Sequence, residues 1–95
     1  MNILSPKAQT LAHQLEQDIL GLAATRGLDK TFCPSDVARA VGGPHPEGWG
    51  PLMQPIRRVA VQLAKEGRLV ITRRGKPVDP DDFRGVYRLG LPRED

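Results

Sequence analysis

Glycine and proline divide this sequence into short segments, and their positions constrain the fold more than any other feature. The 95 residues include ten glycines and nine prolines, which gather at residues 42–51 and 75–85, with further glycines at 27 and 67. Neither residue type favours a helix interior or a central strand, so regular elements have to fit between these positions. The intervals predict a long helix, a short helix, a third helix and two short strands.

The helices follow from apolar residues that recur at intervals of three and four. Residues 5–26 form the first helix, with Ser5 as cap, Pro6 as first helical residue and a stop at Gly27. Residues 34–41 (PSDVARAV) give two turns. The third helix ends near residue 66, and Pro55 leaves open whether it begins there or has a kinked first turn from residue 51. The connector GGPHPEGWGP is expected to be irregular, with its tryptophan packed on the third helix.

The C-terminal third reads as two paired strands. Residues 68–72 (RLVIT) and 86–91 (VYRLGL) alternate in polarity, and residues 73–85 make a long hairpin loop rich in turn formers. Earlier in the chain, residues 30–33 (KTFC) are long enough for one strand-like bridge. The order predicts a helix-rich α+β fold of the winged helix-turn-helix type, with three helices and a C-terminal β-hairpin wing. Residues 1–95 are too few for two cores, so we expect a single domain.

Several stretches resemble a family of short bacterial proteins catalogued as a domain of unknown function. The resemblance covers roughly residues 15–91 and rests on TFCPSDVARAVGG, on LMQPIRRVAVQLAKEGRLVITRRGKPVDP after a tryptophan, and on DFRGVYRLGL. It implies a winged-helix-like fold and no particular activity.

Composition and targeting signals indicate the compartment and exclude a membrane span. The chain is 39% hydrophobic and 26% charged, which suits a small folded protein. No apolar run approaches the roughly 20 residues that cross a bilayer, and the N-terminal residues do not resemble a secretory signal. A single cysteine excludes an internal disulfide. We expect a cytoplasmic protein.

The sequence contains no arrangement of residues typical of an enzyme or a metal site. It has no paired nucleophile and base and no glycine-rich phosphate loop after a strand. Cys33, His13 and His45 match no zinc spacing, and the acidic residues at 79–82 lack the calcium-loop pattern and read as a turn. We therefore predict no enzymatic activity, no cofactor, no metal and no small-molecule substrate.

Cys33 precedes the second helix and has two interpretations. It can be the cap residue, with Pro34 in the first helical position and Asp36 reaching back to its amide, and then it is a small packing residue. Alternatively, a sulfur at a helix N-terminus favours the thiolate and makes Cys33 a redox-sensitive thiol. Asp36 and the absence of a second cysteine favour the structural interpretation.

Positive charge is concentrated in one part of the chain. Residues 49–76 carry seven basic side chains and one acidic one, a net charge of +6, although the whole chain is only +3. In a winged helix the outward face of the third helix enters the major groove and the wing contacts phosphates. The nucleic-acid-binding residues predicted on this basis are Gln54, Arg57, Arg58, Gln62, Lys65, Arg73, Arg74 and Lys76.

Two functions fit these features. The first is a transcription-regulator-like protein that binds double-stranded DNA and pairs with a second copy through the exposed side of its first helix. The second is a protein-interaction module with the same fold, whose basic face meets an acidic partner and does not bind DNA. The acidic turn that follows Lys76 favours the second hypothesis, because it would repel phosphate.

Overall fold

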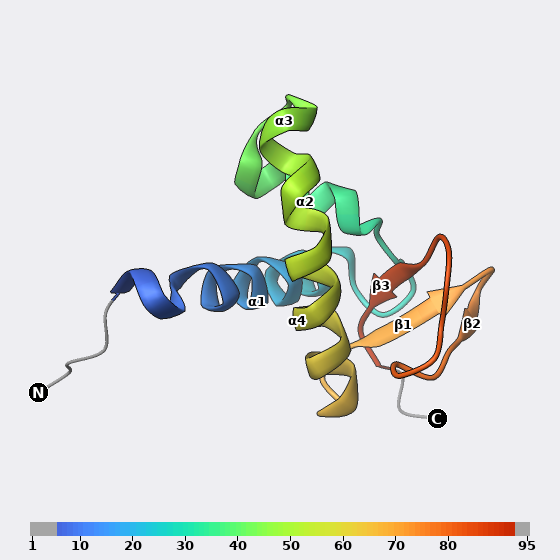
Figure 1. Cartoon of the computed structure of the whole chain (residues 1–95). Coiled ribbons are helices and arrows are strands. Elements are labelled where there is room, and N and C mark those ends of the chain that lie inside the picture. Colours follow the sequence, from blue (N-terminus) through green and yellow to red (C-terminus); the bar gives the residue numbers. More distant parts are fainter. Residues whose placement is uncertain (1–5, 93–95) are drawn as a thin grey trace, which may run out of the picture.

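The computed structural model describes residues 6–92, with side chains from residue 11 onward. Figure 1 shows two long helices that cross, with a small antiparallel sheet beside the second. The elements are α1 (Pro6–Arg26), α2 (Pro34–Gly42), α3 (Pro46–Trp49), the 3-10 turn η1 (Gly50–Leu52), α4 (Met53–Lys65), β1 (Val70–Arg73), β2 (Lys76–Pro77) and β3 (Arg88–Gly90). The predicted helix-rich α+β fold is confirmed, and the arrangement is compatible with a winged helix.

Helix α1 has the predicted extent and a glycine stop. Gly27 adopts a left-handed φ of 85° and donates its N–H to the Ala23 carbonyl, which ends the helix at Arg26. Its buried side chains are Leu15 and Ile19 together with Ala23, one stripe along the helix. The predicted cap, Ser5, lies outside the described residues.

Cys33 occupies the N-cap position of α2, at the start of the predicted second helix. Pro34 occupies the first helical position, where its missing N–H leaves no acceptor unpaired. The Cys33 N–H donates to the Asp36 carboxylate at 3.2 Å, and the same carboxylate adds negative charge to the first turn. At the other end, Gly43 takes a φ of 89° and terminates the helix.

Helix α4 answers the question that Pro55 left open. The helix begins at Met53, so Pro55 is its third residue and lies in the first turn, where an amide needs no intrahelical acceptor. The preceding turn, η1, is a separate 3-10 segment. Ile56, Ala60 and Leu63 are buried, as the periodicity predicts.

The expectation of an irregular connector between α2 and α4 is wrong. Two of its prolines start helical turns, because Pro46 and Pro51 occupy first-turn positions of α3 and η1, whereas Pro44 lies in the bend before α3. Its glycines allow the turn to fold back on α2, since a Cβ built on Gly42 would lie 2.4 Å from the Gly48 oxygen. A Cβ on Gly48 would lie 2.3 Å from the Gly42 oxygen. Trp49 packs on the core as predicted, with the Arg39 guanidinium 5.5 Å from its ring centroid.

The sheet has the order β2-β1-β3 and is antiparallel throughout. The pairing of β1 with β3 confirms the two predicted strands, whereas β2 lies in the segment predicted as loop. A two-residue turn joins β1 to β2, with positive φ at both Arg74 (52°) and Gly75 (80°). Two positive values match the twist of a tight hairpin, and arginine in the first position explains why the pattern did not indicate this turn. We call residues 74–87, which connect β1 to β3, the wing.

The predicted strand-like bridge in KTFC is confirmed. Phe32 pairs with Leu89 of β3 through two backbone hydrogen bonds of 2.9 Å. Both side chains are fully buried. The bridge joins the segment between α1 and α2 to the sheet, and the buried residues form one core between the helices and the sheet.

Candidate nucleic-acid interface

The outward face of α4 carries the polar residues that the helical periodicity predicts. Gln54, Arg58, Gln62 and Lys65 are all exposed. Two of them have intramolecular partners: the Gln62 amide donates to Glu66 at 2.9 Å, and Lys65 lies 3.2 Å from the Asp81 carboxylate. The Gln62 amide, assisted by Arg68, holds the pKa of Glu66 below its usual range.

Arg57, also predicted to bind nucleic acid, is instead held by the wing. Its guanidinium carbon lies 3.8 Å from the centroid of the Phe83 ring, and Nη2 donates to the Phe83 carbonyl at 2.8 Å. The Phe83 ring packs edge-on against Tyr87, with ring centroids 5.2 Å apart. Arg57 therefore joins α4 to the wing, and both aromatic side chains are buried.

Tyr87 carries a buried hydroxyl without a hydrogen-bond partner among the described residues. Burial raises the pKa of this hydroxyl above its usual value of about 10, and the positive charge of Arg57 opposes the shift. The ring of Tyr87 thus packs in the core, and burying its hydroxyl without a hydrogen bond costs free energy.

One ion pair joins the acidic turn of the wing, residues 79–82, to α4. Asp81 pairs with Lys65, and the Asp79 side chain accepts the Asp81 N–H at 2.9 Å. This arrangement explains how an acidic turn can follow a basic hairpin: the Asp79 and Asp81 carboxylates make local contacts, and Asp81 neutralises a cation at the C-terminal end of α4.

The basic residues of the hairpin fall into two groups. Arg73 donates from Nε to the Val86 carbonyl at 3.0 Å and is half-buried. Arg74 and Lys76 are exposed, and neither makes a hydrogen bond or ion pair within residues 11–92. Arg84, which sequence reasoning missed, shares this state. Its position between a buried aromatic and a glycine was the signal for an exposed loop cation.

Cys33 is half-buried, and its sulfur lies 3.0 Å from the Ser35 hydroxyl oxygen. These contacts agree with a small packing residue at a helix start. Among the described residues, no group of three or more histidine, cysteine or acidic side chains is arranged to hold a metal ion. No helix between residues 6 and 92 is long and apolar enough to cross a membrane.

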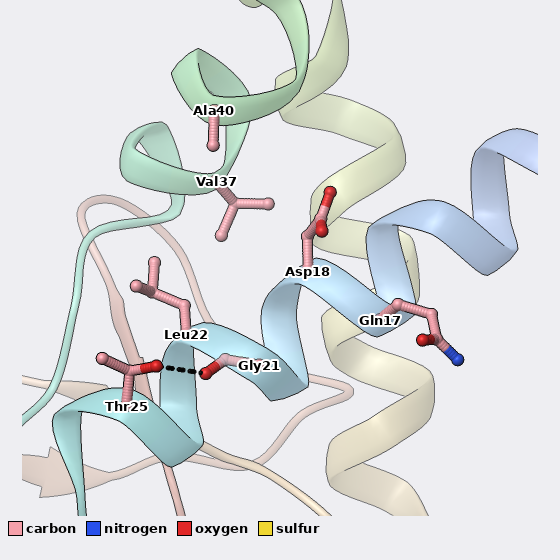
Figure 2. Close-up of a pocket in the computed structure, with 7 residues that line it drawn as sticks. All are labelled: Gln17, Asp18, Gly21, Leu22, Thr25, Val37 and Ala40. Atoms are coloured by element: carbon pink, nitrogen blue, oxygen red, sulfur yellow. Dashed lines mark hydrogen bonds between the residues drawn. The ribbon is translucent and has the colours of Figure 1, made fainter.

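A shallow depression of about 330 Å³ lies between α1 and α2. Figure 2 shows Leu22 of α1 and Val37 of α2 directed toward each other across it, with Asp18 on the side of α1 and a hydrogen bond from Thr25 to the Gly21 carbonyl. Its only charged lining residue is acidic. The depression is therefore unsuited to phosphate and is separate from the basic residues of α4 and the wing.

Comparison with known proteins gives a family without an assigned activity. The model of a family described as "Protein of unknown function (DUF3253)" matches residues 12–92. No curated protein matches the chain.

Proposed function

Because the chain belongs to this family of unknown function, we propose its activity from the interface itself: it is a small, non-enzymatic winged-helix protein that binds double-stranded DNA. In this proposal the outward face of α4 enters the major groove and the wing contacts phosphates. The observation that carries it is the placement of free cations. Among residues 11–92, five lysine or arginine side chains make no hydrogen bond or ion pair. Four of them lie on α4 or the wing, namely Arg58, Arg74, Lys76 and Arg84. The fifth, Lys30, lies elsewhere, between α1 and α2.

On α4, the base-reading residues proposed are Gln54 and Arg58. Both are exposed and have no intramolecular partner among the described residues. Arginine pairs with guanine through two donors, and glutamine pairs with adenine through a donor and an acceptor. Gln62 and Lys65 stand on the same face, and binding would require them to exchange Glu66 and Asp81 for DNA. Exposed pairs of this kind contribute little, so the exchange costs about 1 kcal/mol or less.

In the proposal, Arg57 and Arg73 have a different role, because both have partners in the wing. Each donates to a backbone carbonyl of the wing, Arg57 to Phe83 and Arg73 to Val86. They fix the wing against α4 and β1 and do not themselves reach DNA. The proposed contact set is thus smaller than the set expected from the sequence.

The protein is further proposed to act as a homodimer through α1, in a cytoplasmic setting. Leu11, in the N-terminal half of α1, has 42% of its surface exposed. Helix-turn-helix proteins often pair so that two units read two half-sites.

The test is fluorescence anisotropy of the purified protein with a labelled duplex of random sequence at about 50 and 200 mM salt. Three phosphate contacts, from Arg74, Lys76 and Arg84, predict a salt slope of about 2.7, hence a loss of affinity of roughly fortyfold between the two conditions. Arg58→Ala should weaken binding, whereas Lys30→Ala, a free cation outside the interface, should not. Absence of binding at both salt concentrations would refute the proposal and favour a protein-interaction module with an acidic partner.

A further inference from the structure

The topology of the sheet brings two loop tips together at one end. Strand β1 is central, with β2 paired on one side and β3 on the other. Its C-terminal end, at Arg73, therefore lies beside both the start of β2 and the segment that leads into β3. We call the Arg74 and Gly75 turn the first tip and residues 84–86 the second tip. Figure 1 shows both at the end of the sheet away from the C-terminus of α4.

Arg73 holds the second tip to β1. Its Nε donates to the Val86 carbonyl at 3.0 Å, and its guanidinium runs along Gly85, where a Cβ would lie 2.9 Å from Nη2. Gly85 also has a φ of 82°, which disfavours a side chain at this position. The second tip is thus fixed by a side chain from the strand that ends in the first tip.

The second tip presents an apolar side chain next to a cation. Val86 is 81% exposed, while its carbonyl is occupied by Arg73. Arg84 is exposed and has no partner among the described residues. Arg74 at the first tip and Lys76, the first residue of β2, are also exposed and have no partner among the described residues. The end of the sheet therefore combines three free cations with one exposed isopropyl group.

We propose that these two tips form one binding surface for the sugar-phosphate edge of a duplex, in which Arg84 and Val86 are binding residues and Arg73 is a positioning residue. The cations would pair with phosphate oxygens, and the valine would pack on the apolar face of deoxyribose at the minor groove, where DNA-binding proteins place apolar side chains. This inference rests on the proposed DNA-binding function and deepens it, because it adds a sugar contact by Val86 and makes the phosphate contact of Arg84 depend on Arg73.

The two proposed contacts differ in how salt affects them. Replacing Arg84 by alanine removes a phosphate contact, so the salt slope should fall by about 0.9. Val86→Ala removes apolar contact only, so affinity should fall about threefold to tenfold at each salt concentration while the slope stays unchanged. The matched control is Lys30→Ala, which should change neither quantity. Since both side chains are exposed, thermal denaturation should give wild-type stability for both variants.

The positioning role of Arg73 has its own test. Arg73→Lys keeps the charge but lacks the Nε–H that the Val86 carbonyl accepts. We expect the salt slope to fall by about 0.9, as in Arg84→Ala, with no further fall when the two changes are combined. A wild-type slope in Arg73→Lys would show that only its charge matters and would overturn the positioning role.

Failure of this inference is distinguishable from failure of the proposed function. If the wild-type protein binds duplex and Arg58→Ala weakens it, but Arg84→Ala and Val86→Ala behave like wild type, the second tip is not a binding surface and DNA binding stands. If the wild-type protein does not bind duplex, both proposals fall.

Discussion

Arg57 and Arg58 are neighbours on α4 with opposite environments, and this difference predicts opposite effects of the same substitution. Arg57 stacks on the Phe83 ring and donates to the Phe83 carbonyl, whereas Arg58 is exposed and has no contact of this kind among the described residues. We expect Arg57→Ala to lower stability strongly. Arg58→Ala should leave stability unchanged and reduce DNA binding.

The magnitude follows from the two contacts. A cation over an aromatic ring contributes about 0.5–2 kcal/mol, and a hydrogen bond from a charged donor about 1.5–3 kcal/mol. Removal of both should lower the free energy of unfolding by about 2–4 kcal/mol, a large fraction of the roughly 5–15 kcal/mol typical of a folded domain. At about 4–8 °C per kcal/mol for a chain of this size, the melting temperature should fall by roughly 10–25 °C.

The assay is thermal and urea denaturation of both variants, followed by circular dichroism. Arg58→Ala is the matched control, and its free energy of unfolding should stay within about 0.5 kcal/mol of wild type. Phe83→Leu keeps an apolar side chain but removes the ring, so its combination with Arg57→Ala should cost less than the sum of the single changes. A loss below about 0.5 kcal/mol in Arg57→Ala, or additive effects in the double variant, would refute the role of Arg57 as a link between α4 and the wing.

Four further substitutions test the packing and capping of the fold. Tyr87→Phe should raise stability by about 1 kcal/mol, because it removes a buried hydroxyl without a described partner. Above about pH 10 the wild-type protein should lose stability, because the unfolded chain releases the phenol proton while the folded protein, in which the pKa of Tyr87 is raised, retains it. Tyr87→Phe should abolish this loss. A series of urea denaturations at pH 8–11 measures both effects. Gly42→Ala should destabilise the protein, since its Cβ would lie 2.4 Å from the Gly48 carbonyl oxygen. Gly21→Ala should stabilise it by about 0.5–1 kcal/mol, because a Cβ at this position on α1 meets no other atom. Equal melting temperatures for the two variants would contradict both expectations. Asp36→Ala should cost about 1 kcal/mol, because it removes the carboxylate that accepts the Cys33 N–H at the start of α2. An unchanged urea midpoint would show that this contact contributes nothing.

The fold was largely predictable because its main signals are local. Apolar periodicity and glycine stops placed the helices, and alternation placed β1 and β3. The connector was not predictable in the same way, since Pro46 and Pro51 initiate helical turns. In addition, Gly42 and Gly48 lie against each other only in the folded structure. The hairpin turn at Arg74 was missed because arginine rarely adopts positive φ, and only the pairing of the flanking strands imposes it.

The sequence indicated which basic residues surround the candidate interface, but not which of them are free and which hold the wing in place. Charge density located the basic segment, and helical periodicity correctly separated the exposed residues of α4 from the buried ones. Whether a particular arginine is free depends on distant partners: Arg57 meets Phe83, and Arg73 meets Val86. These contacts join residues 26 and 13 positions apart, so no local pattern could assign them.

The bridge between Phe32 and Leu89 also affects how the protein folds during translation. A ribosome delivers the chain from its N-terminus, so the helices emerge first and β3 is the last of the strands to appear. Contacts as distant as that between Thr31 and Arg88, 57 positions apart, form slowly because a long loop has to close. During synthesis Phe32 therefore cannot pair with β3 until Leu89 has left the ribosome, so the helices form before this part of their core is complete.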